Sequence, residues 1–214
     1  HKTIYGIDWE GLAVGDEKVR SLDQDRSLTY LKMRSEKLSG PVDAIEFTLS
    51  DQLQGEDQYR VKKDDTSEEQ GFDVTTLGAT AQLESESSIG QWVYGTEYYR
   101  DSVDSYLRKF KANGSLSKED IQGPVTDHAT YDSLGIYVQD TVSAAGGVLD
   151  VIPGLRYSYF GADANEVLDP ISGGAMSVEE DWEAVTASMR FLYPLASGRR
   201  HILFAGIAQG FRAP

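Results

Sequence analysis

Residues 133–160, SLGIYVQDTVSAAGGVLDVIPGLRYSYF, decide the fold of this chain. In the first half of the stretch, an extended backbone places four apolar side chains on one side, namely Leu134, Ile136, Val138 and Val142. The other side collects small and polar residues, namely Gly135, Tyr137, Gln139 and Thr141. Alternation with a period of two predicts a β-strand with one apolar face.

The second half of the stretch predicts a return strand. Gly146 and Gly147 interrupt the alternation, and paired glycines supply the positive φ angles of a tight turn. After the turn, one face holds Leu149, Val151, Leu155, Tyr157 and Tyr159. The opposite face holds Asp150, Gly154, Arg156 and Ser158. We therefore expect a long antiparallel hairpin that is apolar on one side and polar on the other.

The composition narrows the class of protein. The 214 residues carry a formal charge of −15, which argues against a nucleic-acid partner, because phosphates demand a basic surface. No apolar run approaches the ~18–20 residues of a membrane helix, but a membrane β-barrel alternates its faces and leaves the mean hydropathy unremarkable. Twelve tyrosines and three tryptophans are typical of membrane interfaces, and the absence of cysteine excludes disulfides and thiolate metal sites.

Alternation elsewhere predicts further strands. We expect them at residues 25–34, 45–50, 72–84, 91–105, 182–195 and 201–211. The short connections fall near residues 37–41, 85–90, 144–148 and 196–200, and the long ones at residues 1–24, 58–71, 109–132 and 161–180. Short and long connections alternate, which predicts an all-β, antiparallel up-and-down meander of about eight strands with its long loops at one rim.

This order of connections favours a membrane barrel. Outer-membrane barrels have short periplasmic turns and longer extracellular loops. A soluble β-sandwich needs crossovers between its sheets, so its loop lengths do not sort in this way. On this interpretation the apolar residues of residues 133–160 and 182–195 face lipid, including Val185, Ala187, Met189 and Phe191. Gln139, Arg156, Ser188 and Arg190 then face the lumen.

The residues that carry chemistry do not form a catalytic pattern. The chain has no nucleotide loop and no nucleophile elbow, so we expect neither an enzyme nor a cofactor or resident metal site. Of the three histidines, His1, His128 and His201, only His128 stands beside an acid, Asp127, and a solvated loop histidine is the better interpretation than a metal ligand or general base. Glu97, Arg100 and Asp101 are interpreted as ordinary polar groups of a barrel lumen.

Three motifs resemble one family. Tyr137, Gln139 and Asp140, followed by Pro153, Gly154, Arg156 and Tyr157, resemble the "YxQD … PGxRY" hairpin of TonB-dependent outer-membrane receptors. YGTEYYRD at residues 94–101 resembles a strand of the same group. The last five residues, Gly210, Phe211, Arg212, Ala213 and Pro214, resemble its "GFRAP" motif, and the haem and siderophore receptors are the most similar members. The order of the three motifs also matches.

The resemblance implies a location and a function. It implies that residues 1–214 are a fragment of a large transmembrane β-barrel domain in the bacterial outer membrane, whose plug domain and remaining strands are absent from this chain. It implies TonB-energised uptake of an iron chelate, haem or a similarly scarce nutrient. The partners would be outer-membrane lipid, the plug domain, TonB and the ligand, while the substrate-binding residues remain unknown.

Two alternatives remain open. One is a complete small eight-stranded outer-membrane barrel that acts as an anchor, adhesin or enzyme, because eight strands can close around their own side chains. The other is a secreted β-sandwich that binds carbohydrate through its tyrosines.

The predicted inner face argues against closure of eight strands. It holds small residues: Gly78, Gly95, Gly135, Gly154, Thr76, Thr80, Thr141, Thr186, Ser158 and Ser188. These would leave a narrow interior underpacked, and voids are costly. We therefore expect an open arc of a wider barrel with both edge strands unpaired, and we expect the isolated chain not to insert as a stable monomer, because lipid offers the edge no hydrogen-bond partners.

Overall fold

The computed structural model describes residues 8–9, 12–13, 17–122, 126–168, 174–195 and 201–213. Nearly all of this part of the chain is strand. The main sheet is formed by β3 (Glu17–Glu36), β4 (Ala44–Lys62), β5 (Ser67–Glu86), β6 (Gln91–Phe110), β7 (Leu116–Asp120), β8 (Asp127–Ala144), β9 (Leu149–Leu168), β10 (Ala175–Pro194) and β11 (Ile202–Ala208). Two short strands, β1 (Asp8–Trp9) and β2 (Leu12–Ala13), pair only with each other, and η1 (Ala145–Gly147) is a single 3₁₀ turn.

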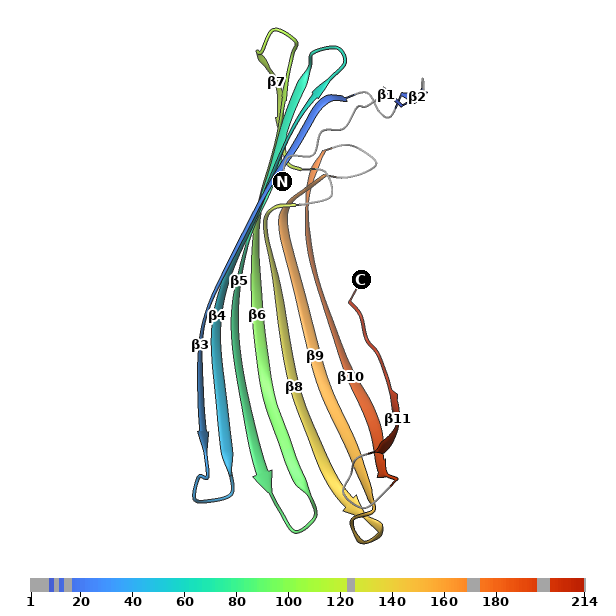
Figure 1. Cartoon of the computed structure of the whole chain (residues 1–214). Coiled ribbons are helices and arrows are strands. Elements are labelled where there is room, and N and C mark those ends of the chain that lie inside the picture. Colours follow the sequence, from blue (N-terminus) through green and yellow to red (C-terminus); the bar gives the residue numbers. More distant parts are fainter. Residues whose placement is uncertain are drawn as a thin grey trace.

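The predicted meander is confirmed. Eight strands lie in the order β11-β10-β9-β8-β6-β5-β4-β3, so that each pairs with its neighbour along the chain, and β7 adds a short hairpin to β6. The turns at residues 37–43, 87–90 and 145–148 meet at one end of the sheet (Figure 1). Ala145, Gly146 and Gly147 all have positive φ, as the central turn requires. No helix in the described residues is long and apolar enough to cross a membrane.

The predicted long loops are largely wrong. β4 runs to Lys62 and β5 begins at Ser67, so the expected loop at residues 58–71 is a tight turn between two strand extensions. β9 and β10 likewise extend through most of residues 161–180, β3 begins at Glu17, and β6, β7 and β8 occupy much of residues 109–132. These extensions carry charged and polar residues on both faces among scattered apolar ones and show no sustained alternation, but the backbone ladder continues through them. The strands therefore project well beyond the length that a bilayer requires.

The register separates the apolar and polar faces as predicted. Val138 pairs with Leu155, and Leu155 pairs with Ala187, which places the apolar set on one face. Tyr137 pairs with Arg156, and Arg156 pairs with Thr186, on the opposite face. We call this polar side the inner face. All ten glycine, threonine and serine positions predicted for it share it.

The apolar face forms a belt at one end of the strands. A transverse row of Leu31, Leu49, Ala79, Tyr98, Leu134 and Tyr159 marks its upper limit. One row further along, the same face carries charges at Asp51, Arg100, Asp132 and Asp181. The apolar segment covers residues 134–142 of β8 and 185–193 of β10, which agrees with the ~9–11 residues that a tilted strand needs to cross a bilayer.

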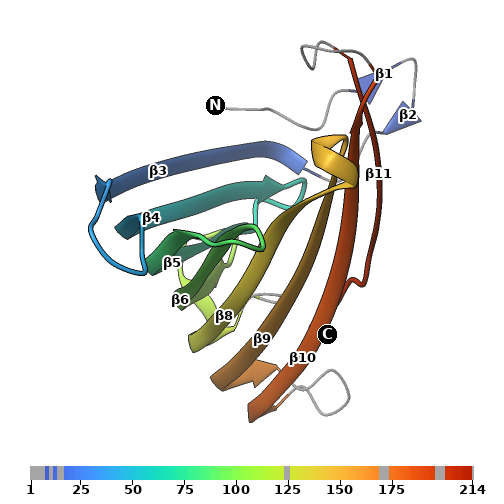
Figure 2. The ribbon, with the colours of Figure 1, turned by 90° about the horizontal axis from the view of Figure 1, so that it is seen from below.

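The sheet has almost no buried core. In the described part of the chain only Ala44, Ile121 and Ile152 are buried apolar residues, whereas Val185 is 68% exposed and Ile207 is 74% exposed. The sheet curves into an arc seen along its strands (Figure 2). β3 and β11 form its edges and do not pair with each other, so the expectation of an open arc is confirmed.

The opposite facing of neighbouring residues gives a direct test. Met189 lies in the apolar belt, and Ser188 lies on the inner face opposite Gly154. Met189→Arg should reduce the free energy of unfolding by about 2–4 kcal/mol, because it places a charge near mid-bilayer, whereas Ser188→Arg should cost far less. Urea unfolding of the full barrel in lipid vesicles, followed by tryptophan fluorescence, measures both. Equal losses for the two variants would contradict the assigned faces.

Candidate functional site

The inner face is organised by side chains that reach across a glycine. Gly95 of β6 lies between Gln82 of β5 and Tyr137 of β8, and the Tyr137 hydroxyl donates a hydrogen bond to Gln82 Oε1 over a distance of 3.0 Å. Gly135 of β8 lies between strands β6 and β9 in the same way, and Arg156 crosses it to bind Glu97. The glycines therefore do not leave voids, because side chains from both flanking strands lie over them.

Close contacts show why these positions hold glycine. A Cβ atom on Gly135 would lie 2.2 Å from Arg156 Nη2, and one on Gly95 would lie 2.4 Å from the Ala81 carbonyl oxygen. Gly78 has the same arrangement, since its Cβ would lie 2.4 Å from Ser50 Oγ and 2.6 Å from the Tyr99 ring. The bridging side chain thus occupies the space that a side chain at the glycine position would need.

Arg156 is the centre of this network. Its guanidinium forms an ion pair with Glu97, and its Nε donates a hydrogen bond to Ser158 Oγ at 3.1 Å. The Arg156 and Glu97 side chains are only partly exposed. The ion pair therefore connects β9 to β6 across the intervening strand β8, in addition to the backbone ladder.

A second polar cluster lies on the inner face towards the end with the short turns. Arg34 of β3 contacts Glu36 at 2.6 Å, Glu84 at 3.0 Å and Glu46 at 3.3 Å. Lys32 also pairs with Glu46, at 2.7 Å. On the other side of the arc, Arg190 of β10 donates to Gln139 of β8. The polar groups thus extend over the whole width of the sheet.

The family-motif residues divide between the two faces. Tyr137, Gln139, Gly154 and Arg156 lie on the inner face, and Asp140, Pro153 and Tyr157 alternate with them on the apolar face. Tyr157 donates a hydrogen bond to Glu183 at 2.7 Å.

Asp140 is only 6% exposed although it lies on the apolar face. It occupies the space beside Gly90, where a Cβ would lie 2.3 Å from Asp140 Oδ1. An alanine at position 90 would therefore collide with this carboxylate.

The GFRAP motif, residues 210–214, lies after β11. Gly210, Phe211, Arg212 and Ala213 follow the last described strand, and Pro214 lies outside the described residues. The Phe211 ring is 6.0 Å from the Phe160 ring, which in turn is 6.0 Å from the Tyr131 ring. The motif thus returns along the sheet to an aromatic cluster on β8 and β9.

The remaining charged residues and histidines singled out from the sequence lie in different places. Glu97 and Asp101 lie on the inner face, but Arg100 does not, because it lies on the opposite face and approaches Asp132 at 3.8 Å. Arg100 lies at an even position and Glu97 and Asp101 at odd positions of the strand, so their side chains face opposite sides. The prediction treated the three residues as one group and missed this. His201 is exposed next to β11, and His1 lies outside the described residues. Arg34, Glu46 and Glu84 were missed because each joins the cluster through a different strand.

The strand extensions carry charged residues on both faces. An inner row near the far end contains Arg20, Arg60, Glu68, Lys109 and Lys118. On the other face, Asp23 and Asp57 pair in register, and Tyr106 donates a hydrogen bond to Asp57 at 2.6 Å across Gly71. Burial and the neighbouring Asp57 carboxylate raise the pKa of Tyr106 to about 12.

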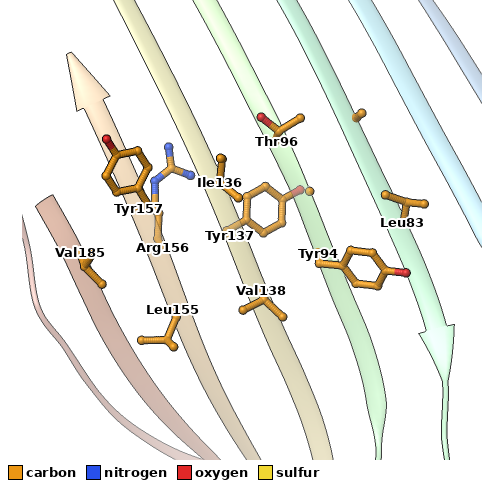
Figure 3. Close-up of a pocket in the computed structure, with 12 residues that line it drawn as sticks. Leu83, Tyr94, Thr96, Ile136, Tyr137, Val138, Leu155, Arg156, Tyr157 and Val185 are labelled. Atoms are coloured by element: carbon orange, nitrogen blue, oxygen red, sulfur yellow. The ribbon is translucent and has the colours of Figure 1, made fainter. Parts of the chain in front are cut away.

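The apolar face has a shallow hollow of about 570 Å³ over β5, β6, β8, β9 and β10 (Figure 3). Figure 3 shows Leu83, Tyr94, Val138, Leu155 and Val185 around it. These side chains belong to the lipid-height belt, so the hollow suits an acyl chain. Because this hollow belongs to the lipid-facing side, the candidate functional surface is the polar inner face.

A family profile decides the identity. The profile described as TonB dependent receptor-like, beta-barrel matches residues 9–214. This chain belongs to the TonB-dependent receptor β-barrel family. The receptors of this family are bacterial outer-membrane proteins, so the predicted family and location are confirmed, and the β-sandwich alternative is wrong.

Solved structures agree with the family assignment at the level of fold. The copper transporter OprC is 17% identical, with a TM-score of 0.69 over 87% of this chain and 30% of its own. The ferric preacinetobactin receptor BauA from Acinetobacter baumannii is 15% identical, with a TM-score of 0.64 over 96% of this chain and 32% of its own. The ferric citrate transporter FecA, in the unliganded form, is 15% identical, with a TM-score of 0.59 over 85% of this chain and 27% of its own. No curated protein sequence matches.

The chain thus spans about a third of the length of these receptors. Their names indicate transport or reception of ferric chelates in two cases and of copper in one. The ligand therefore differs between these three proteins.

The glycine bridges of this receptor wall predict the cost of adding a methyl group. Gly95→Ala should destabilise the barrel by about 1–3 kcal/mol, because the new Cβ meets the Ala81 backbone oxygen, which cannot rotate away. Gly154→Ala is the matched control on the same face, since its nearest neighbour is the Ser188 hydroxyl, which can rotate. Urea unfolding in vesicles measures both, and similar costs would contradict the crowding of Gly95 by the Ala81 backbone.

Proposed function

We propose that residues 1–214 form part of the barrel wall of an outer-membrane receptor that takes up an iron chelate, haem or a similarly scarce nutrient with energy from TonB. The observation that carries the proposal is the family match over residues 9–214. The remaining strands and a plug domain would come from outside these residues. In this role the wall is a transporter component and not an enzyme.

The inner face supplies what a plug domain needs from its barrel. The bridge of Arg156 and Glu97 and the cluster around Arg34 offer donors and acceptors across the middle of the wall. Glu97 and Arg34 keep about a third of their side chains exposed, so these groups retain surface for a partner. A polar wall also lets a plug rearrange at low cost, because water can replace each lost hydrogen bond.

The charges at the far end of the inner face support an anionic cargo. The row of Arg20, Arg60, Lys109 and Lys118 contains one carboxylate, Glu68, which Arg60 contacts at 2.7 Å. Two carboxylates beside the row also pair with it: Glu17 with Arg20 and Arg60, and Asp120 with Lys118. Among the described residues Lys109 makes no direct ion pair, but Lys118, and with it Lys109, lies near enough to Asp120 to lower the pKa of that carboxyl. The row lies in the strand extensions beyond the lipid belt, at the end opposite the short turns, which in the proposed function is the end where a ligand enters. Ferric chelates with carboxylate groups carry the complementary charge.

Uptake measurements test the proposed function. A strain that lacks the gene should lose uptake of at least one radiolabelled ferric chelate under iron limitation, and the full-length gene should restore it. Collapse of the proton gradient, or deletion of tonB, should abolish the restored uptake. Unchanged uptake across a panel of ferric chelates and haem, together with loss of copper uptake, would contradict the assignment of an iron ligand.

Neighbouring charges on opposite faces give a sharper prediction. Lys109→Glu should weaken binding of the anionic chelate about tenfold or more, because it reverses a charge on the inner face near the entrance. Arg108→Glu is the matched control, since Arg108 points to the other face and pairs with Glu119 at 2.8 Å. Binding of the chelate to the purified receptor, measured by quenching of tryptophan fluorescence, separates the two. Equal effects of the two variants would refute an inward anion site.

A further inference from the structure

We infer that Asp104, Asp127 and His128 form a binding site for a divalent transition-metal ion on the outer wall of the receptor, beyond the lipid belt. Nothing in the family assignment or the proposed cargo route requires such a site. It lies on the outward face of the sheet, outside the lumen. Sequence reasoning considered His128 and Asp127 as a pair, and the fold adds the third ligand, Asp104.

The distances suit one metal ion. His128 Nδ1 lies 2.9 Å from Asp104 Oδ1 and 3.5 Å from Asp127 Oδ1. One ligand atom from each of the three side chains lies within 4.8 Å of the other two. Zinc binds imidazole nitrogen and carboxylate oxygen at about 2.0–2.2 Å, so tetrahedral ligands stand roughly 3.3–3.6 Å apart. Small side-chain rotations would bring all three atoms to that spacing.

The backbone brings the three residues together from two strands. Asp104 lies near the end of β6, and Asp127 and His128 begin β8 after the chain has passed through β7. Val103 pairs with Ala129, so continuation of this register places His128 opposite Asp104 on the same face. Consecutive residues of a strand normally face opposite sides, but the backbone at His128 has φ 50°, which interrupts the alternation, and Asp127 Oδ1 lies 3.5 Å from His128 Nδ1. Asn165 of β9 donates a hydrogen bond to the His128 carbonyl at 3.2 Å and fixes this peptide.

One of the ligands is also held in orientation. Asp127 Oδ1 accepts a hydrogen bond from the Ser105 backbone N–H at 2.8 Å. Outer contacts of this kind orient the carboxylate ligands of metal sites. The Asp127 side chain is only 20% exposed, whereas the Asp104 and His128 side chains are about two-thirds exposed. The site is therefore anchored on one side and open to solvent on the other.

The negative charge of nearby carboxylates favours a cation at the three ligands. Asp73 pairs with Asp104 in register, and Asp25 lies two strands further along the same row, across Gly55. The Cβ position of Gly55 lies 2.9 Å from Asp73 Oδ1 and 3.0 Å from Asp25 Oδ1, so both carboxylates lean into this space. A row of carboxylates beside the three ligands raises the local concentration of divalent cations.

The ligand set selects the class of metal. Imidazole favours zinc, copper, nickel and iron, whereas carboxylates alone favour magnesium, calcium and manganese. One imidazole with two carboxylates combines both ligand types, and the imidazole shifts the preference from magnesium and calcium towards zinc, which also accepts carboxylate oxygen. Zinc is the probe that follows from this chemistry.

The test is zinc binding by the full-length receptor, purified in detergent and freed of metal by chelation. Calorimetry should show one more zinc bound per wild-type chain than per His128→Ala chain. Asp104→Asn preserves size and should also lower the affinity at least tenfold. His201→Ala is the matched control, since it removes an exposed histidine near the opposite end of the sheet and should bind zinc like the wild type. Cobalt provides a second probe, whose visible absorption should change with His128→Ala.

Two results would overturn the inference. One is equal zinc stoichiometry and affinity in the wild type, His128→Ala and Asp104→Asn. The other is an equal loss of binding in His201→Ala and His128→Ala, which would indicate nonspecific binding to histidines. Heat-dependent migration of each variant on a denaturing gel shows that its barrel is folded, so misfolding cannot imitate a loss of ligands.

Discussion

The backbone hydrogen-bond ladder is the interaction on which the rest of this wall depends. Lipid offers no partners to N–H and C=O groups, so each spanning strand must find its partners in its neighbours. The register from β3 to β11 meets this requirement through a sequential meander, while the described residues bury almost no apolar core. β3 and β11 are the edges of the described sheet. The same constraint implies that each of them pairs with a further strand in the membrane. Family membership supplies the context in which those strands exist.

The ladder also decides how the inner face is built. Strands about 4.8 Å apart are too close for large side chains at every position of a curved inner wall. Glycines at positions such as 95 and 135 free the space that Tyr137 and Arg156 then cross. The bridges bind alternate strands to each other and leave polar groups facing the lumen. The surface proposed to meet the plug is thus a consequence of the way the wall packs.

The sequence predicted the belt well and the extensions poorly, for one physical reason. Between Leu134 and Val142, one face meets lipid and the other meets a polar lumen, so the alternation is visible in the residues. Residues 58–71 and most of 161–180 have water on both faces, so the period disappears although the ladder continues. Their charges therefore suggested loops. Length beyond the membrane could not be inferred from a pattern that only the membrane imposes.

For the candidate sites, the sequence predicted the face of most residues but not their partners on other strands. Tyr137 and Arg156 could be placed on the inner face from alternation, but their partners Gln82 and Glu97 lie more than fifty positions away along the chain. Arg100 was assigned to the wrong face because a motif was considered as a block. Asp104 could not be joined to His128 without knowledge of the register between β6 and β8, in which the neighbouring residues Val103 and Ala129 pair. Contacts across strands depend on register, and register follows from the whole sheet.

The distance between the two edge strands tests the central claim most directly. Residues 1–214 contain no cysteine. Spin labels can be attached at Ser35→Cys on β3 and Ile207→Cys on β11 in the full-length receptor, with any cysteine outside these residues replaced by serine. Seven interstrand steps of about 4.8 Å separate these strands along the arc, so pulsed electron resonance should give a distance of roughly 25–35 Å. A distance below about 15 Å, as between adjacent strands, would show that the eight strands close on themselves and would contradict the open wall of a larger barrel.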